Sequence, residues 1–178
     1  MQKAFARVFI LACALGLLAG CHAHRQTAAP AVAMPATSIE LREPRPGVYT
    51  AGQPAAEDWS AIAARGVGTV IDLRAPGELQ GRDEAAEVHS AGLRYVSIPV
   101  AGAGGIDDAN AKALRAALDA ADGPVLVHCA SGNRVGGLLA LMQARSGAMT
   151  TEQALEFGRS AGMTSTEARV RELLDAGE

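Results

Sequence analysis

Residues 125–134, VLVHCASGNR, decide the fold that we predict for this chain. They begin with Val125 to His128, an apolar run typical of a central strand buried on both faces of a parallel sheet. The run ends at Cys129, where a polar turn containing a glycine begins. A helix is expected to follow from Arg134 to about Arg145. The stretch therefore predicts a strand, a turn that carries a cysteine, and a helix.

The segments on either side continue this alternation. The expected strands are 47–50, 69–73, 94–98 and 125–128. The expected helices are 54–64, the second half of 77–91, 107–121, 134–145, 151–160 and 164–176. Strands that alternate with helices pair in parallel, so we predict a single α/β domain. Its four- to five-stranded, mainly parallel sheet is flanked by helices on both faces, with a site at the carboxyl end of the central strands.

The first 46 residues are expected to lie outside this domain. Lys3 and Arg7 precede an apolar run from Val8 to Ala19, which is typical of a secretory signal and too short to span a bilayer. From His22 to Pro46 the chain is rich in Ala, Pro, Thr and Ser and has no apolar period, which predicts a flexible tether. The two tether histidines lack a third metal ligand. The predicted parts are a signal peptide at 1–20, a tether at 21–46 and the domain at 47–178.

The sequence LAGC at residues 18–21 resembles the lipobox of bacterial lipoproteins. The resemblance implies cleavage before Cys21 and attachment of diacylglycerol to Cys21. The mature chain would then be held by lipid at a membrane of the bacterial cell envelope, on the periplasmic side. An ordinary cysteine after a plain signal peptide is the alternative interpretation of Cys21.

Charge and cysteine content narrow the classes of function. Loss of Lys3 and Arg7 with the signal leaves 14 of the 16 basic residues beside all 19 acidic ones, a balance that argues against a nucleic-acid partner. Cys13 would leave with the signal and Cys21 would be lipidated, so Cys129 would be the lone thiol of the domain. In an oxidising compartment a lone thiol is either buried and inert or kept for chemistry.

The turn after Cys129 is suited to binding an anion. Its backbone N–H groups and the N-terminus of the following helix converge on one point and favour negative charge. The same field favours the thiolate, which is the nucleophilic form of cysteine. Arg134 lies five residues further on, where its planar guanidinium can hold two oxygens of a tetrahedral anion. A cysteine that attacks while an arginine holds the anion indicates phosphoryl or sulfur transfer.

The chain resembles the cysteine-dependent protein tyrosine phosphatases. The resemblance is to the bacterial dual-specificity-like branch, which includes the domain fused to metallo-β-lactamase-type hydrolases. It spans about residues 48–144, most of the domain. The segments that carry it are GVYTAGQP at 47–54, TVIDLR at 69–74, IPV at 98–100 and the loop that begins with His128 and Cys129.

This resemblance implies a role for each residue of the loop. Cys129 would be the nucleophile that forms a phosphocysteine, and Arg134 would bind the phosphoryl oxygens. His128 would support the thiolate. The backbone amides of Ala130, Ser131, Gly132, Asn133 and Arg134 would cradle the phosphate, and Gly132 would permit the close turn. The resemblance implies no metal or cofactor, and a substrate that is a phosphorylated small molecule or a phosphoprotein, such as one that carries phosphotyrosine.

Three features depart from the usual phosphatase pattern. Four residues separate Cys129 from Arg134 instead of five, a spacing also found in single-domain sulfurtransferases of the rhodanese type. Val135 stands where many phosphatases have a hydroxyl. The general acid is expected among Asp107, Asp108 and Asp72, although the first two are equally suited to capping a helix.

Two alternatives to a phosphatase therefore stay open. The chain could be a sulfurtransferase that carries a persulfide on Cys129, or a phosphate-binding protein without turnover.

Overall fold

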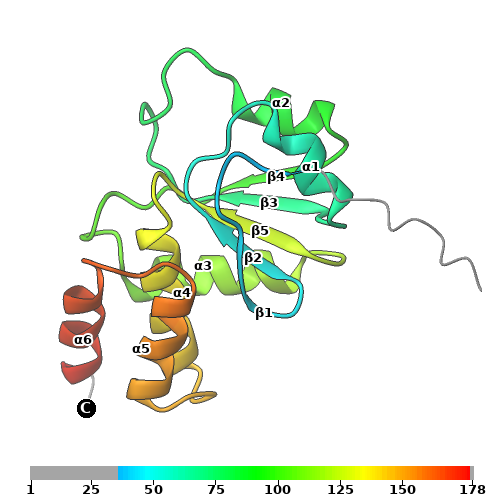
Figure 1. The fold of residues 1–178 in the computed structure, drawn as a ribbon. Coiled ribbons are helices and arrows are strands. Elements are labelled where there is room, and N and C mark those ends of the chain that lie inside the picture. Colours follow the sequence, from blue (N-terminus) through cyan, green and yellow to red (C-terminus); the bar gives the residue numbers. More distant parts are fainter. Residues whose placement is uncertain (1–35, 177–178) are drawn as a thin grey trace, which may run out of the picture. The chain divides into compact units, whose positions relative to one another are not determined.

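The computed structural model describes residues 36–176. The strands are β1 (Arg42–Arg45), β2 (Val48–Ala51), β3 (Thr69–Asp72), β4 (Arg94–Ser97) and β5 (Val125–His128). The helices are α1 (Asp58–Ala64), α2 (Glu84–Ser90), α3 (Asp108–Asp119), α4 (Asn133–Arg145), α5 (Thr151–Ser160) and α6 (Glu167–Asp175). Figure 1 shows α1 and α2 on one face of the sheet and α3 to α6 on the other. This is the predicted α/β domain with helices on both faces.

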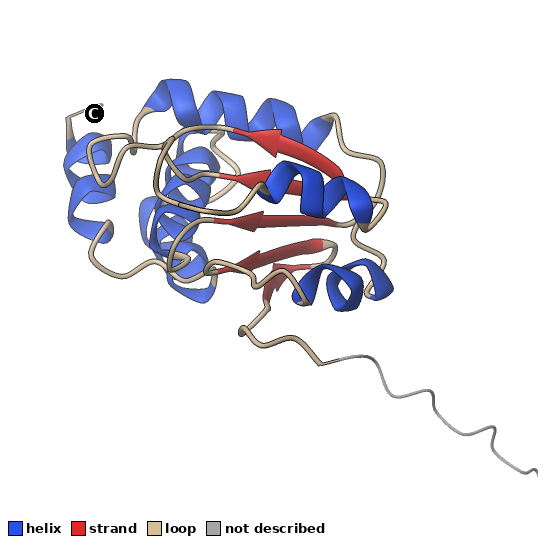
Figure 2. Cartoon of the chain, turned by 90° about the horizontal axis from the view of Figure 1, so that it is seen from above, coloured by secondary structure: helices blue, strands red, loops and turns tan. Residues whose placement is uncertain are grey.

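The strands form one sheet in the order β1-β2-β5-β3-β4. β5 pairs in parallel with both β2 and β3, and β4 pairs in parallel with β3. The prediction of a mainly parallel sheet with β5 at its centre is confirmed. The register aligns the last residues of the four parallel strands, Ala51, His128, Asp72 and Ser97. The carboxyl ends of these strands and the loops that follow them therefore meet at one edge, seen from above in Figure 2.

β1 corrects the predicted start of the domain. Its four residues, REPR, were placed in the tether, but they pair antiparallel with β2 at the edge of the sheet. An edge strand is open to solvent and tolerates charge and proline, so it has no apolar period that would distinguish it from a tether. Ser38 also belongs to the domain, because its backbone and hydroxyl both donate to Asp58, at 2.6 and 2.7 Å.

The predicted signal peptide, Cys21 and the tether up to residue 35 lie outside the described residues. Within residues 36–176, no helix combines the length and the hydropathy needed to cross a bilayer.

Two apolar cores lie on the two faces of the sheet, and β5 contributes to both. Val125 and Val127 pack into the core under α3 to α6. Leu126 packs on the opposite face, in the core that includes Trp59 of α1. This alternation follows from the two-residue period of a strand. It places His128, two residues after Leu126, on the same face as Leu126, toward α1 and α2. There its ring contacts that of Trp59 edge to face, with 6.1 Å between the ring centroids.

Helix α4 is buried along most of its length because the helices beside it approach closely. A Cβ atom on Gly136 would overlap the backbone of Met163 and would lie 2.5 Å from the Gly158 oxygen. A Cβ atom on Gly137 would lie 2.7 Å from the Thr166 hydroxyl. The glycines at the start of α4 therefore let α5 and the α5–α6 connection pack directly behind the Cys129 turn.

Candidate active site

The turn after β5 holds the sulfur of Cys129 against the N-terminus of α4. Gly132 adopts φ +86°, the left-handed conformation, and caps α4. In this conformation its N–H donates to Cys129 Sγ at 3.1 Å. Ala130 and Ser131 are exposed, whereas Cys129 has no exposed surface. The predicted convergence of a turn amide and a helix N-terminus on the cysteine is present in the structure.

The neighbouring strands fix both ends of this turn. On one side the N–H of Leu73, just after β3, donates to the His128 oxygen at 2.9 Å. On the other the N–H of Gln53, just after β2, donates to the Ala130 oxygen at 3.1 Å. Gly52 permits this approach, since a Cβ atom there would lie 3.2 Å from the same oxygen. The GQP segment therefore helps to fix the backbone of the Cys129 turn.

Arg134 is held by a carboxylate that we did not single out from the sequence. Glu78 accepts from Nη1 at 2.6 Å and from Nη2 at 2.5 Å, and the Val100 oxygen accepts from Nη1 at 2.8 Å. The hydrogen bonds from Arg134 hold the pKa of Glu78 below its usual value. The bonds to Glu78, together with the charge of Cys129, raise the pKa of Arg134. The guanidinium is thus charged, and Glu78 and the Val100 oxygen hold its orientation.

A shallow cavity of about 320 Å³ opens over this turn. Its walls come from four segments of the chain, and the lining residues are Glu78, Gly102, Ala103, Ser131, Asn133, Arg134, Ser165 and Thr166. Among the described residues, Glu78 is the only carboxylate that lines this cavity. Gly102 and Ala103, in the loop after the IPV segment, form one wall.

Asn133 joins the turn to the connection between α5 and α6. Its Oδ1 accepts from the N–H groups of Thr164 and Thr166, at 2.8 and 3.2 Å, and its Nδ2 donates to the Ser165 hydroxyl at 2.7 Å. The Thr166 hydroxyl donates to the backbone oxygen of Asn133 at 2.9 Å. The Asn133 side chain is therefore engaged in bracing, and its backbone N–H is the group it can offer to an anion.

His128 lies in a buried polar cluster on the other face of the sheet. Its Nε2 is 2.9 Å from Glu84 Oε1 and 3.8 Å from Asp72 Oδ1. Arg74 donates through Nε and Nη2 to the two oxygens of Asp72, at 2.9 and 2.6 Å, and its Nη2 lies 3.0 Å from Glu84. The Tyr95 hydroxyl also donates to Asp72, at 2.7 Å. The histidine that precedes Cys129 is thus surrounded by charged groups and not by the apolar core alone.

Each of these charged groups is stabilised by its neighbours. Burial alone would raise the pKa of Asp72, but hydrogen bonds from the side chain and backbone of Arg74 and from Tyr95 hold it below its usual value. Burial would lower the pKa of Arg74, yet Asp72 and Glu84 together raise it. Burial and the bond to Asp72 raise the pKa of Tyr95. Asp72 is therefore an ionised partner of Arg74, and its carboxylate is not free to donate a proton.

Asp72, Glu84 and His128 present donor atoms within 4.8 Å of one another, a grouping that could hold a metal ion. The guanidinium of Arg74 contacts both carboxylates, however, and supplies the positive charge that a cation would bring. A second cation beside it would be repelled. The positive charge of Arg74 therefore makes the cluster poorly suited to a metal ion.

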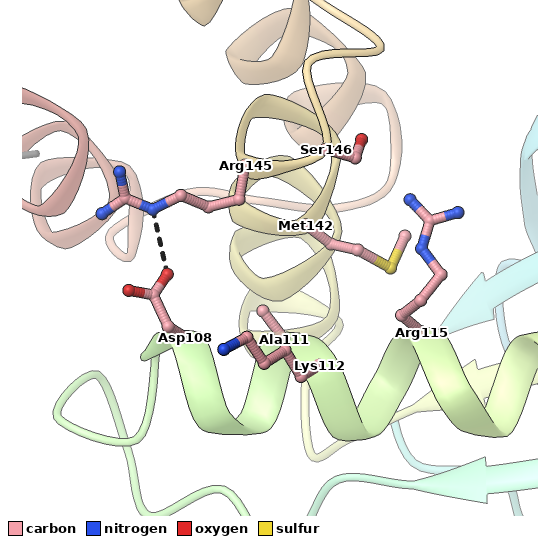
Figure 3. Close-up of a pocket in the computed structure, with 7 residues that line it drawn as sticks. All are labelled: Asp108, Ala111, Lys112, Arg115, Met142, Arg145 and Ser146. Atoms are coloured by element: carbon pink, nitrogen blue, oxygen red, sulfur yellow. Dashed lines mark hydrogen bonds and ion pairs between the residues drawn. The ribbon is translucent and has the colours of Figure 1, made fainter.

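The structure gives Asp107 and Asp108 roles other than that expected of a general acid. Asp107 caps α3, where its side chain accepts from the Asn110 N–H at 2.7 Å. Asp108 forms an ion pair with Arg145 at 2.9 Å, in a separate hollow between α3 and α4 (Figure 3). Neither lines the cavity over the Cys129 turn. The capping interpretation, which the sequence left open, describes Asp107, whereas Asp108 is the ion-pair partner of Arg145.

The family model of the beta-lactamase hydrolase-like protein, phosphatase-like domain, matches residues 40–146. The chain belongs to this family. Beta-lactamase hydrolase-like proteins of Xylella fastidiosa and Agrobacterium fabrum are 36% and 33% identical to it over 115 and 116 residues. These regions cover 62% and 63% of this chain and 26% and 27% of the relatives. The phosphatase-like chain thus spans about a quarter of the length of the curated relatives it matches.

Solved phosphatase structures share the fold. TpbA of Pseudomonas aeruginosa superposes with a TM-score of 0.63 at 25% identity, covering 79% of this chain and 86% of TpbA. A candidate phosphatase of Neisseria meningitidis superposes with a TM-score of 0.64 at 21% identity, covering 74% and 96%. A Cys-to-Ser variant of TpbA is known in complex with phosphotyrosine and superposes with a TM-score of 0.58 at 23% identity, covering 78% of this chain and 94% of that one. The similarity supports a hydrolase of the phosphatase kind.

The Asp72–Arg74 pair predicts how stability depends on pH. Asp72→Asn should lower the free energy of unfolding at neutral pH by about 3 kcal/mol, because it leaves a buried guanidinium without its counter-charge. Since the pKa of folded Asp72 lies below the usual 3.8, its contribution is present above that pH and is lost as the pH falls through the lower, folded value. The difference between wild type and variant should therefore narrow below pH 3.8.

Urea unfolding of wild type and Asp72→Asn, followed from neutral pH to below pH 3.8, measures the difference in the free energy of unfolding. Asp119→Asn serves as the control because Asp119 is exposed and has no ion pair within the described part of the chain. A variant as stable as wild type at neutral pH, or a difference that does not change with pH, would contradict the assignment.

Proposed function

We propose that this domain is a cysteine-dependent phosphatase that hydrolyses phosphomonoesters through a phosphocysteine on Cys129. The observation that carries the proposal is the hydrogen bond from the Gly132 N–H to Cys129 Sγ at the N-terminus of α4, beside the charged side chain of Arg134. Donors aimed at a sulfur stabilise a thiolate, and an adjacent guanidinium attracts a dianion to the same place. Membership of a phosphatase-like family supports the same chemistry.

In the proposed reaction the Cys129 sulfur attacks the phosphorus, and the bond from phosphorus to the ester oxygen breaks. The ester oxygen leaves as an oxyanion with the electron pair of that bond and takes a proton from solvent water, and the phosphoryl group remains on sulfur. Water then attacks the phosphorus, which releases inorganic phosphate and restores the thiolate. The amides of the turn and Arg134 hold the equatorial oxygens throughout, because charge on these oxygens is stabilised by fixed donors.

The open cavity suits a phosphate on a protruding group, such as the phosphotyrosine that the TpbA variant binds. Exposed Ala130 and Ser131 and the glycine loop leave room for an aromatic ring above the turn. We therefore infer that aryl phosphates, among them phosphotyrosine, are the substrate class. A phosphorylated small molecule or a phosphoprotein both fit this inference.

Replacing the nucleophile separates the three candidate functions. The wild-type protein should hydrolyse p-nitrophenyl phosphate, and Cys129→Ser should abolish this activity, because serine has no accessible anion at neutral pH. The same proteins are assayed for sulfur transfer from thiosulfate to cyanide, with the far-ultraviolet circular dichroism of the variant as the control for folding.

Sulfur transfer without phosphate hydrolysis would replace the phosphatase by the sulfurtransferase, which the four-residue spacing between Cys129 and Arg134 leaves open. Binding of inorganic phosphate by a wild-type protein that is silent in both assays would identify a binding protein without turnover.

The character of the cavity predicts a preference for good leaving groups. Glu78 is the one carboxylate that lines the cavity in the described part of the chain, and its lowered pKa keeps it ionised. It cannot then donate a proton to the leaving oxygen. A positioned general acid contributes about 10²–10⁴-fold, so alkyl phosphates should be hydrolysed at least about 100-fold more slowly than aryl phosphates.

The ratio of kcat/KM for p-nitrophenyl phosphate and phosphoserine measures this preference. Glu78→Gln should lower both values by weakening the orientation of Arg134, but it should leave their ratio unchanged. Comparable rates on the two substrates would contradict the inference, as would a loss in Glu78→Gln confined to phosphoserine.

A further inference from the structure

A buried carboxylate of α2 reaches the Cys129 turn from the face of the sheet that the proposed reaction does not use. Glu84 is the first residue of α2, and Asp83 caps this helix by accepting from the Ala86 N–H. Although glutamate is rarely buried, the Glu84 side chain is only 3% exposed. The cap and the helix thus place a charge under the carboxyl ends of the central strands.

Three groups from three segments converge on the Glu84 carboxylate. Gln53 Nε2 donates to Oε2 at 2.6 Å, and Arg74 Nη2 lies 3.0 Å from the same oxygen. His128 Nε2 lies 2.9 Å from Oε1. Within residues 36–176, Oε1 and the two ring nitrogens of His128 make no hydrogen bond of regular geometry. The approach of Oε1 to Nε2 is therefore a close polar contact, and the hydrogen bond from Gln53 is the one that holds the carboxylate.

The residues that Glu84 contacts flank the cysteine on both sides. His128 precedes Cys129 directly. Gln53 binds the residue that follows the cysteine, because its backbone N–H donates to the Ala130 oxygen. One carboxylate therefore acts through two partners on the two peptide units next to Cys129, although Glu84 itself touches neither the sulfur nor the cavity.

The charges of the cluster explain why the contact with His128 is favourable. Asp72 is engaged by both donor groups of Arg74, so the guanidinium largely balances that carboxylate. Glu84 then adds a second negative charge in a site with no exposed surface around the His128 ring. Nε2 is the ring nitrogen that lies next to this charge, 2.9 Å from Oε1, and a carboxylate attracts an N–H group and repels a lone pair. The contact therefore favours the ring orientation seen in the structure.

We propose that Glu84 is a positioning residue of the Cys129 site. By holding the His128 ring and the Gln53 side chain, it keeps the turn in the shape in which the Gly132 N–H donates to the Cys129 sulfur, and so favours the thiolate. The catalytic part of this proposal rests on the proposed function. The proposed effect of Glu84 on the ionisation of the Cys129 thiol does not rest on that function.

Glu84→Gln tests the proposal, since it keeps the size of the side chain and removes the charge. Glu87→Gln is the matched control: Glu87 lies in the same helix and accepts from Arg82 and Trp59, but it has no contact with the turn. The fraction of Cys129 present as thiolate at neutral pH is read from the ultraviolet absorbance of each protein, from which that of its Cys129→Ser counterpart is subtracted. Turnover of p-nitrophenyl phosphate gives kcat and KM.

The proposal predicts a smaller thiolate fraction in Glu84→Gln and a kcat about tenfold lower, which is the size of a single coupling of about 1.4 kcal/mol between neighbouring groups. KM should change by less than about twofold, because the groups that face the phosphate are unaltered. Glu87→Gln should keep the wild-type thiolate fraction and kcat. A wild-type thiolate signal in Glu84→Gln, or equal losses in both variants, would overturn the proposal.

Two further results keep this test independent of folding and of the proposed function. If Glu84→Gln does not fold, Gln53→Leu cuts the second arm of the same network while retaining the backbone N–H that binds Ala130. It should also lower the thiolate fraction, and a wild-type signal there overturns the proposal. If no protein hydrolyses p-nitrophenyl phosphate, the proposed function fails, and the thiolate measurement still decides the role of Glu84.

Discussion

The parallel pairing of β5 with β2 on one side and β3 on the other is the constraint on which the rest of the structure depends. Because all three strands end at the same level, the segments that follow β2 and β3 can bind the backbone on either side of Cys129. The pairing also decides the faces: it sends His128 toward α1 and α2, while the chain after Cys129 turns into α4. A sheet with another strand at its centre would not assemble these groups.

Charge compensation organises the site on both faces of this sheet. Toward the cavity, Glu78 orients the Arg134 guanidinium that is suited to a phosphoryl group. Beneath the turn, Arg74 balances Asp72, and Glu84 faces His128. Each pair joins segments far apart in the sequence or stiffens a strand end, so the turn is held by ionic contacts as well as by the backbone. Such contacts cost desolvation, which is offset here because every carboxylate meets a specific donor.

Much of the architecture could be predicted from local patterns. The apolar run of β5, the turn with Gly132 and the helix after it are readable because each has a period or a special residue. β1 could not be predicted, because an edge strand with the sequence REPR lacks an apolar face. The helix caps at Asp107 and Asp83 follow ordinary capping preferences, yet only the coordinates distinguish the cap at Asp107 from a catalytic acid.

The partners of the reactive residues were harder to predict than the residues themselves. Glu78 and Glu84 both lie in the Glu-rich segment between β3 and β4, where nothing in the sequence distinguishes them from solvated acids. Their roles arise from tertiary contacts with Arg134 and His128, more than 40 residues away in the chain. Its burial distinguishes Glu84 from a solvated acid, but the burial of one residue cannot be predicted from the sequence of a helix as short as α2.

Trapping of the covalent intermediate tests most directly whether Cys129 carries the phosphoryl group. The protein is mixed with p-nitrophenyl phosphate, quenched with acid within the first turnovers, digested and analysed by mass spectrometry. We expect the mass of one phosphoryl group on the peptide that contains Cys129, and no such addition in Cys129→Ser. Continued turnover with an unmodified Cys129 peptide at every quench time, or a phosphoryl group on another residue, would contradict the mechanism.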